Sequence, residues 1–267
     1  MRVTTRNASF QQWQALLTNR TKRQRAGQFL VQGVRPITLA AENGWAIETL
    51  IYPDRQALST WARDLLDESG ATAVAMDLSL LEELSEKESP ELLAVVGLPA
   101  DDFARITVGP RLLTVVFDRP TTPGNIGTLV RSADAFGASG VIITGHAADP
   151  YDPRAVRAST GSLFAVPVVR ADSHREVLDW VGTLSSAPLI IGTDEHGAVA
   201  VAEQDLTGPV VLLVGNETHG LSAGWRSAVD AMVRIPITGA ASSLNAAAAA
   251  SVVLYETVRQ RSSGTGA

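Results

Sequence analysis

The chain has 267 residues, of which 45% are hydrophobic, and a formal net charge of −6 at pH 7. A chain of this size can bury a full core and suits one large or two ordinary domains. It has no cysteine, which excludes a disulfide framework, a thiol nucleophile and a cysteine-based zinc site. The four histidines are too scattered for metal-ligand spacing, so no metal is expected. Without an apolar run near the roughly 18 residues of a membrane span, or a secretory hydrophobic region, the chain is expected to be cytoplasmic and free of membrane contact.

The positive charges gather near the N-terminus. Residues 1–35 hold seven basic side chains and no acidic one. Phosphate contacts act within a Debye length of about 8–10 Å, so this local density matters more than the total charge. The segment 19–27 therefore indicates an exposed turn that contacts nucleic-acid phosphates, with an ordinary solvated basic face as the alternative. The RNA-binding residues predicted in it are Arg20, Lys22, Arg23 and Arg25.

The chain divides near residues 98–110. The first part alternates helical and strand-like patterns, with helices expected over 7–19, 35–43, 56–68 and 78–87 and strands over 29–33, 49–53 and 93–99. A polar stretch bracketed by prolines follows and suits a linker. The second part has continuous apolar runs, at 112–118, 140–145, 164–170, 188–194 and 209–215. Such runs alternating with helices are typical of a parallel sheet covered on both faces. The expected organisation is a domain over 1–98, a linker over 99–109 and a domain over 110–267, which should fold without the first 105 residues or so.

Three segments of the second part carry the candidate chemistry. They are RPTTPGNIGTLVRSADAFG (119–137), PVVLLVGNETHGLS (209–222) and VRIPITGAASSLNAAAAASVVLYE (233–256). In open α/β domains ligands sit at the carboxyl ends of strands, so these loops are expected to build one pocket. Asn125 sits at a helix mouth, and Arg131, about 9 Å further along, leans back toward the same space. The alternative is an N-cap with a surface arginine.

Several common enzyme classes are not supported. The loop 215–222 lacks the Lys-Ser/Thr ending of a phosphate-cradling loop, so ATP use is not expected. The chain has no G-x-S-x-G nucleophile elbow. The glycine-rich dinucleotide fingerprint is also missing after the first strand of the second part.

Together, the three segments resemble the motifs of the SpoU (TrmH-type) class of SPOUT RNA methyltransferases, which transfer methyl from S-adenosylmethionine to ribose 2′-hydroxyls. PGNIGTLVRSADAFG is similar to the first motif, GNETHGLS to the second and IPITGAASSLNAAAAASVVLYE to the third. The likeness covers about 110–260 strongly, and residues 1–98 resemble the small substrate-binding domain of many members. The N-terminal segment is further similar to actinomycete resistance methyltransferases of the avilamycin type. Thr122 replaces the Asn that many relatives carry ahead of Pro-Gly.

The resemblance implies an α/β fold, in which a SPOUT domain with a parallel sheet and a deep trefoil knot follows a small α/β domain. General folding rules alone would reject a knot. It also implies a homodimer and S-adenosyl-L-methionine as cofactor. The residues implied to bind the cofactor are Gly215, Ile235, Leu244, Thr193, Asn216 and Gly220. Those implied to be catalytic are Arg131, Asn125, Glu217, Ser243 and Asn245.

Two classes of function stay open at this point. The first is a 2′-O-ribose methyltransferase acting on large-subunit ribosomal RNA, with antibiotic resistance as one outcome, or acting on transfer RNA. The second is a non-catalytic RNA-binding protein on the same fold. Within the enzyme class, Arg131 is implied to be the base, yet a guanidinium is effectively never deprotonated. Electrostatic stabilisation of the developing alkoxide is physically at least as sound, and Glu217 is an alternative proton acceptor.

Overall fold

The computed structural model describes residues 1–263. The chain packs into two compact units. The first unit combines Met1–Pro99 with Tyr151–Ala165, and the second combines Ala100–Pro150 with the chain from Val166 onward. The chain therefore passes from one unit to the other three times.

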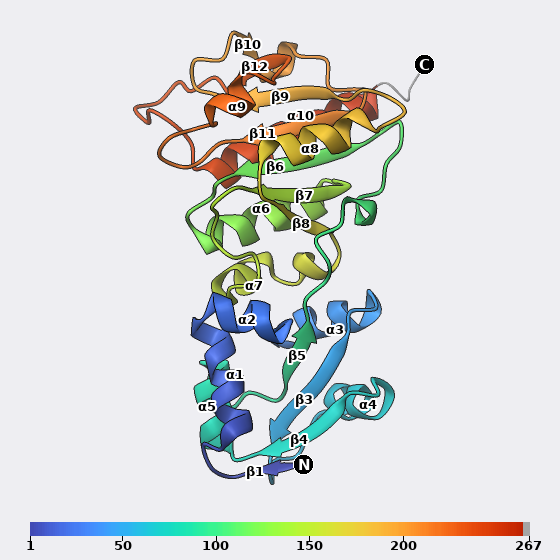
Figure 1. The fold of residues 1–267 in the computed structure, drawn as a ribbon, viewed down its shortest axis with the longest axis vertical. Coiled ribbons are helices and arrows are strands. Elements are labelled where there is room, and N and C mark those ends of the chain that lie inside the picture. Colours follow the sequence, from blue (N-terminus) through green and yellow to red (C-terminus); the bar gives the residue numbers. More distant parts are fainter. Residues whose placement is uncertain (264–267) are drawn as a thin grey trace. The chain divides into compact units, whose positions relative to one another are not determined.

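The first unit is built on a mixed sheet with strand order β1-β4-β3-β5-β2 (Figure 1). Strand β5 runs antiparallel to both β3 and β2, whereas β1, β4 and β3 are parallel. The unit's strands are β1 (Arg2–Val3), β2 (Gln28–Gln32), β3 (Ile47–Pro53), β4 (Thr72–Met76) and β5 (Leu93–Gly97). Its helices are α1 (Ala8–Thr18), α2 (Arg20–Ala26), α3 (Val34–Glu42), α4 (Thr60–Glu68), α5 (Leu78–Ser85), α7 (Pro153–Ser159) and the 3-10 turn η2 (Ser162–Phe164).

The core of the first unit follows from helical periodicity. Helix α1 begins at the N-cap Asn7, whose side chain accepts a hydrogen bond from the Phe10 backbone N–H at 3.0 Å. Phe10, Trp13 and Leu16 then recur every three residues and are buried on one face of the helix. They share one apolar cluster with residues of β2, β3, β4, β5 and α5.

The basic segment 19–27 is a helix rather than the expected turn. Asn19 caps α2, and its side chain accepts from the Lys22 backbone N–H at 3.0 Å. Arg23 is only 2% exposed and donates from Nη1 to the carbonyl of Leu16 at 2.7 Å. The expectation that Arg23 contacts RNA from an exposed turn is therefore wrong, because its guanidinium is buried and bonds a backbone carbonyl near the end of α1. Lys22 and Arg25 are exposed on α2 and Arg20 is partly so.

The segment Tyr151–Ala165 belongs to the first unit although its neighbours in the chain belong to the second. Phe29 of β2 packs against Tyr151 with ring centroids 4.9 Å apart, and Trp45 packs edge-on against Phe164 at 5.0 Å. Residue Asp152 lies 3.7 Å from the buried Arg23 guanidinium. The predicted second domain therefore contains a segment that packs in the first unit. The chain after residue 105 is for this reason not expected to fold by itself, contrary to the expectation from the sequence.

The second unit is built on an all-parallel sheet with strand order β10-β12-β9-β11-β6-β7-β8. This confirms the predicted parallel sheet. The strands are β6 (Leu113–Asp118), β7 (Gly140–Thr144), β8 (Val168–Ala171), β9 (Leu189–Thr193), β10 (Val199–Ala200), β11 (Val210–Val214) and β12 (Ala231–Arg234). The helices are α6 (Pro123–Ala135), α8 (His174–Gly182), α9 (Ala223–Arg226), α10 (Ala246–Ser263) and the 3-10 turns η1 (Phe103–Arg105) and η3 (Val201–Glu203).

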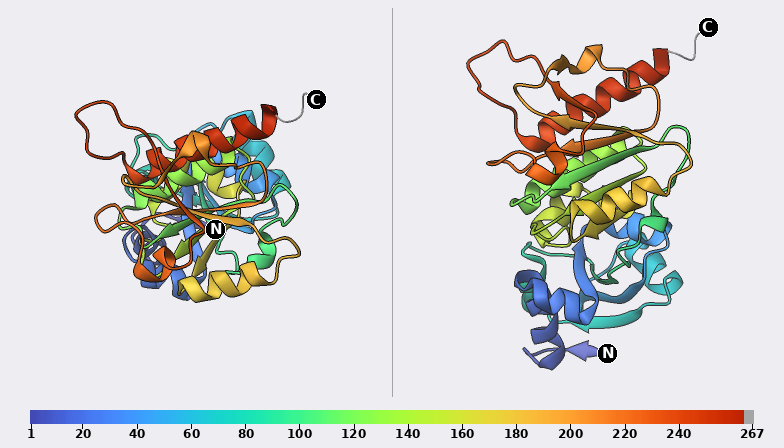
Figure 2. Two further views of the ribbon diagram at one scale, coloured as in Figure 1. Left: turned by 90° about the horizontal axis from the view of Figure 1, so that it is seen from above. Right: turned by 45° about the horizontal axis from the view of Figure 1, so that its top comes forward.

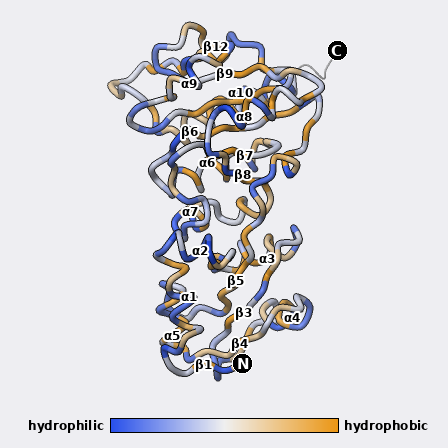
Figure 3. Tube along the Cα trace, in the orientation of Figure 1, coloured by the Kyte–Doolittle hydropathy of each residue, from blue (hydrophilic) through white to orange (hydrophobic). Residues whose placement is uncertain are grey.

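Helices cover both faces of this sheet, with α8 on one side and α10 on the other (Figure 2). Every residue of β6, β7 and β11 is buried, and most of their residues are apolar, the polar ones being Thr114, Asp118 and Thr144 (Figure 3 shows β6 and β7). Such two-sided burial is what a continuous apolar strand requires. Strand β8 is shorter than the predicted run 164–170, because Phe164 ends the turn η2 and packs in the first unit.

The sheet has a switch point between β6 and β11. From β6 the chain adds β7 and β8 on one side, and then places β9, β11 and β12 on the other. Parallel strands with this order leave a crevice at the carboxyl ends beside the switch point. The loops after β6, β9, β11 and β12 therefore meet at one edge of the sheet.

The final helix α10 is held at both ends. Near its start it packs along α6, where the Ser132 and Ser251 hydroxyls lie 2.7 Å apart. At its other end the buried Arg261 guanidinium donates to four backbone carbonyls, those of Leu206, Gly208, Arg111 and Leu112. The knot implied by the family resemblance stays a prediction.

Candidate functional site

A cavity of about 560 Å³ opens at the carboxyl ends of β9, β11 and β12. Its wall is formed by three loops, at residues 193–195, 214–220 and 233–246. All of the residues predicted to bind a cofactor line it, namely Thr193, Gly215, Asn216, Gly220, Ile235 and Leu244. The second and third sequence motifs therefore do build a single pocket.

The glycines of the second loop are required by close backbone contact. A Cβ atom at Gly215 would lie 2.4 Å from the carbonyl carbon of Gly220. Asn216 and Gly220 each donate a backbone hydrogen bond to the other's carbonyl, at 3.0 and 2.9 Å. Gly220 has a φ of 63°, in the left-handed region that glycine adopts without strain. The loop therefore closes on itself as a narrow turn in the wall of the cavity.

Three of the predicted catalytic residues form one hydrogen-bonded cluster. Asn125 donates from Nδ2 to Glu217 Oε1 at 2.9 Å, and Asn245 donates from Nδ2 to Asn125 Oδ1 at 3.1 Å. Glu217 and Asn245 also line the cavity. Each of the three sequence motifs thus contributes one residue to the cluster, which lies at the cavity's edge.

Asn125 is placed differently from its expected cap position. Helix α6 begins at Pro123 with Thr122 as its N-cap residue, so Asn125 is the third helical residue. Its side chain is consequently free to bond Glu217 and Asn245. The N-cap alternative is therefore wrong for Asn125. The residue that caps a helix here is Asn245, directly before α10, whose Oδ1 accepts from the Ala247 backbone N–H at 3.0 Å.

The carboxylate of Glu217 is kept ionised by its neighbours. Partial burial alone would raise its pKa. Hydrogen bonds from Asn125, from the Glu217 backbone and from the backbone and hydroxyl of Thr121 outweigh that effect, so the pKa is lowered below 4.5. A carboxylate with a lowered pKa is a poor proton acceptor near neutral pH. The hydrogen bond that Glu217 accepts from Asn125 suits this carboxylate to orient the Asn125 side chain.

The other two predicted catalytic residues lie apart from this cluster. Ser243 lines the cavity from the exposed loop that precedes α10. Arg131 is exposed on α6, its side chain makes no hydrogen bond or ion pair among the described residues, and it is not among those that line the cavity. Within one chain, the structure does not bring Arg131 into the pocket.

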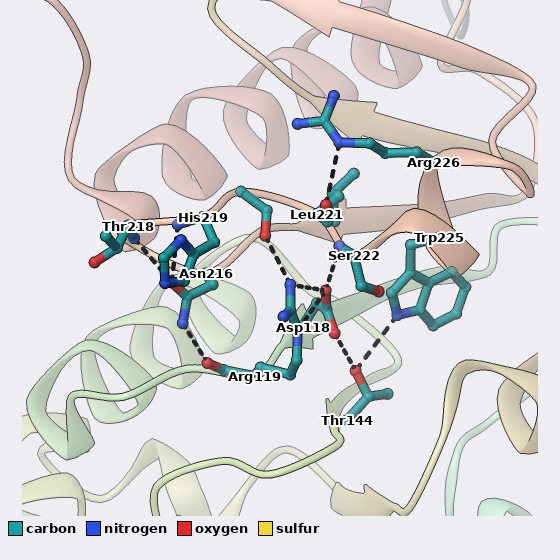
Figure 4. A network of polar contacts seen from close by, with 11 residues as sticks. Asp118, Arg119, Thr144, Asn216, Thr218, His219, Leu221, Ser222, Trp225 and Arg226 are labelled. Atoms are coloured by element: carbon teal, nitrogen blue, oxygen red, sulfur yellow. Dashed lines mark hydrogen bonds and ion pairs between the residues drawn. The ribbon is translucent and has the colours of Figure 1, made fainter.

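Sequence reasoning missed a polar network behind the second loop (Figure 4). Asp118, at the end of β6, accepts from the Ser222 backbone N–H at 2.8 Å and from the Thr144 hydroxyl at 3.2 Å. Arg119 Nη2 donates to the carbonyl of Gly220 at 3.2 Å. The signal available in the sequence was a charged pair directly after a buried strand. Reasoning also missed Asp194, which lines the cavity and pairs with Arg226 at 3.2 Å.

The described part of the chain carries neither a metal-binding cluster nor a membrane-spanning helix. Among residues 1–263, no cluster of three or more histidine, cysteine or acidic residues could hold a metal ion. Over the same residues, no helix has the length and apolar character needed to cross a membrane.

Comparison with known proteins assigns both parts of the chain. Residues 112–255 match the SpoU rRNA Methylase family, and residues 7–94 match the SpoU L30e-like domain. The chain is 58% identical over 268 residues to a 23S rRNA (uridine(2479)-2′-O)-methyltransferase of Streptomyces viridochromogenes, covering 98% of this chain and 93% of the relative.

Solved structures give the same result. The SpoU methyltransferase AviRb from Streptomyces viridochromogenes, in complex with AdoMet, superposes with a TM-score of 0.93 at 56% identity, covering 97% of this chain and 99% of that one. An AdoMet-bound rRNA methyltransferase from Sinorhizobium meliloti superposes with a TM-score of 0.87 at 29% identity, covering 97% of each chain. With both domain matches and the full-length relative in agreement, this chain belongs to the SpoU rRNA methylase family.

Proposed function

We propose that this protein transfers a methyl group from S-adenosylmethionine to the 2′-hydroxyl of a ribose in large-subunit ribosomal RNA. The observation that carries the proposal is the cluster of Asn125, Glu217 and Asn245 at the edge of the cavity. A ribosomal RNA substrate places the protein's work in the cytoplasm, where ribosomes assemble.

The cavity suits S-adenosylmethionine in size and lining. A volume of about 560 Å³ falls in the usual range for sites of small organic ligands. Apolar side chains of Val214, Ile235 and Leu244 can hold the adenine, and the backbone of the narrow turn at Gly215 can bond its polar edge. Acidic side chains at the wall, including Glu217, favour a cationic ligand. When bound, the cofactor supplies an electrophilic methyl group.

The roles of the protein groups follow from their chemistry. Asn125, held by Glu217 and Asn245, can hydrogen-bond the target ribose and orient its 2′-hydroxyl. Ser243 lines the cavity from the third motif and can bond the same ribose or the methionine end of the cofactor. We assign Arg131 to electrostatic stabilisation of the developing alkoxide, because its guanidinium stays protonated.

The first unit supplies RNA affinity in this proposal. Lys22 and Arg25 are exposed on α2, and Arg20 is partly exposed beside them. No acidic residue occurs in the chain before Glu42. Helix α2 therefore offers a basic surface for the sugar–phosphate backbone. The domain organisation predicted from sequence, with residues 1–98 selecting the RNA and 110–267 carrying the catalytic site, remains part of this proposal.

We also propose that the working form is a homodimer. Helix α10 buries one face against the sheet and α6, yet Val252 is 37% and Tyr255 55% exposed. Large apolar side chains on one exposed helix are typical of an interface with another chain. A second copy of the same helix is the simplest cover, because closed symmetric dimers are the most frequent assemblies.

Mapping ribose methylation tests the reaction. RNA from cells with and without the gene would be compared for 2′-O-methyl sites, with an Asn125→Ala variant as the inactive control. We expect one ribose of large-subunit ribosomal RNA to lose its methyl group in the deletion and in the variant. Loss of a transfer RNA site instead would reassign the substrate. No change in methylated sites would identify a non-catalytic RNA-binding protein.

Resistance to an antibiotic of the avilamycin type is a further part of the proposal. A methyl group on a ribose in the drug's binding site would obstruct it sterically. Expression of the wild-type protein in a susceptible host should raise the inhibitory drug concentration, whereas the Asn125→Ala variant should not.

A further inference from the structure

Two charged residues at the end of β6 bond a loop of the cavity wall without lining the cavity themselves. Asp118 is 3% exposed and Arg119 follows it directly. Neither is among the described residues that line the cavity. Both nevertheless bond the loop 216–222, which forms one wall of the cavity (Figure 4).

Arg119 holds the loop through its backbone. Its φ is 52°, a left-handed conformation that is uncommon for a residue other than glycine. In this conformation its carbonyl accepts from Asn216 Nδ2 at 2.7 Å. The Oδ1 atom of the same Asn216 side chain accepts from the backbone N–H groups of Thr218 and His219, at 2.9 and 3.0 Å. The Arg119 carbonyl thus fixes the side chain around which the loop turns.

Arg119 also holds the loop through its guanidinium. Nη2 donates to the Gly220 carbonyl at 3.2 Å, and Nε donates to Asp118 Oδ2 at 3.2 Å. The same Gly220 carbonyl accepts the backbone N–H of Asn216 at 3.0 Å, so the guanidinium reinforces the closure of the turn. A Cβ at Gly145 would lie 2.9 Å from Arg119 Cγ, which indicates that the neighbouring strand end leaves room for this side chain.

Asp118 connects the loop to the helix behind it. Its Oδ2 accepts from the backbone N–H of Ser222, the N-cap residue of α9, at 2.8 Å. Helix α9 ends at Arg226, which lines the cavity and pairs with Asp194. The Asp118 carboxylate, at Ser222, and the Arg119 carbonyl, at Asn216, therefore fix the two ends of the segment that contains Glu217.

From these contacts we propose that Asp118 and Arg119 are positioning residues for methyl transfer. They set the conformation of the loop 216–222, which brings Glu217 against Asn125 and shapes the wall of the cofactor pocket. The inference rests on the proposed role of Glu217 in catalysis. Arg119 touches neither reacting group, so its effect on the reaction must pass through the loop.

The variant Arg119→Gly distinguishes the contribution of the guanidinium from that of the backbone carbonyl. Glycine adopts the left-handed conformation freely, so the carbonyl bond to Asn216 is kept while the side-chain bonds are lost. Calorimetry with S-adenosylhomocysteine should show affinity weakened by about 10-fold, and methyl transfer to a large-subunit RNA transcript should slow by roughly 10- to 100-fold. Arg119→Lys keeps a charge but not the planar fork, and it should recover part of both losses.

A double-mutant cycle tests whether the effect passes through Glu217. In a Glu217→Gln background, Arg119→Gly should slow transfer by less than about threefold further. Arg105→Ala is the matched control, because Arg105 also donates to backbone carbonyls, those of Ala100 and Val168, but at the amino end of β8. It should leave cofactor affinity and transfer rate within twofold of wild type.

Each outcome decides the proposal. Wild-type affinity and rate in Arg119→Gly would overturn it, as would equal losses with and without Glu217. Unfolding of both the Gly and the Lys variants would assign the pair to stability alone and overturn the positioning role. If the wild-type protein failed to methylate the transcript, the proposed function would fail, yet cofactor affinity would still test the pair because that measurement needs no RNA.

Discussion

The indole Nε1 of Trp45 donates a hydrogen bond to the carbonyl oxygen of Phe164 at 3.0 Å, although 119 residues separate the two in the chain. Trp45 comes from the segment that matches the L30e-like domain, and Phe164 from the segment that matches the methylase family. Both lie in the first unit, where Phe164 is 3% exposed. The boundary between the family segments is therefore not the boundary between the folded units.

This contact predicts the result of a truncation. Deleting residues 1–105 should expose the apolar side chains of Tyr151 and Phe164, which are otherwise buried against the first unit. The fragment is expected to aggregate or to melt well below the full chain in a thermal scan. A second fragment, with Tyr151–Ala165 replaced by a short glycine-serine linker, should be soluble and should bind S-adenosylhomocysteine. Equal behaviour of the two fragments would contradict this reading of the segment.

A substitution in the catalytic cluster should affect rate more than stability. Asn125→Ala removes the hydrogen bonds with Glu217 and Asn245, and we expect methyl transfer to fall by about 100-fold. Because Asn125 lies at the cavity's edge rather than in the core, the melting temperature should change little. Thr128→Ala on the same helix is the control, since Thr128 is exposed and bonds only its own helix at the Gly124 carbonyl. A comparable loss in the control would point to damage to α6.

The pH dependence of stability should report on Glu217. Its pKa is lowered in the folded protein, so its ionised form stabilises the fold above the unfolded value of 4.5, and that contribution is lost as pH falls through the lower folded pKa. The difference in melting temperature between wild type and Glu217→Gln should be constant from pH 6 to 8 and should shrink at about pH 4 and below. A difference that grew with acidity would show that the pKa is raised instead.

Replacing Arg131 should separate catalysis from binding. The Arg131 side chain is exposed and has no hydrogen bond among the described residues, so Arg131→Ala should fold normally and bind S-adenosylhomocysteine as wild type does. Transfer should fall by at least about 100-fold if its charge stabilises the alkoxide. Single-turnover assays at saturating cofactor would measure this. Near-normal turnover would remove Arg131 from the catalytic set.

RNA affinity should depend on the exposed charges of α2. Lys22→Ala with Arg25→Ala should weaken binding and reduce the salt slope by up to about 2, or roughly 0.9 per lost phosphate contact. Arg63→Ala on α4 removes an exposed charge of the same unit and should have no such effect. Filter binding at several salt concentrations would measure both. An unchanged slope in the double variant would identify α2 as a solvated surface.

Arg23 requires separate treatment because it is buried. Its guanidinium bonds the carbonyls of Leu16 and Leu17 and lies near Asp152, so Arg23→Ala would act mainly on stability. It therefore does not belong in a test of RNA binding.

Sequence alone predicted the second unit well where its signals were continuous. The run 112–118 became β6, and the apolar runs at 140–145, 188–194 and 209–215 became β7, β9 and β11. Fully buried parallel strands leave a strong signal because both faces must be apolar. The meeting of the second and third motifs in one pocket followed from the rule for strand ends, whereas no residue of the first motif, 119–137, lines that pocket.

The remaining features depend on contacts that a local pattern does not carry. Strand β4 was missed because its residues Thr72–Met76 are partly exposed and mostly small. The burial of Arg23 depends on the end of α1 and on Asp152, a residue 129 positions further along the chain. The bond between Asn125 and Glu217 spans 92 residues. A charged side chain can hydrogen-bond buried backbone groups or face solvent. The residue type alone does not tell which of these two roles it has.

The four carbonyls bound by Arg261 have a consequence for synthesis of the chain. Two belong to Arg111 and Leu112, directly before β6, and two to the loop of Leu206 and Gly208 before β11. During translation these groups leave the ribosome about 50 to 150 residues before Arg261 does. Until then the central strands lack the last helix across their face, and those carbonyls lack the hydrogen bonds that Arg261 donates. The nascent second unit must therefore stay incomplete until the final turn of α10 has been made.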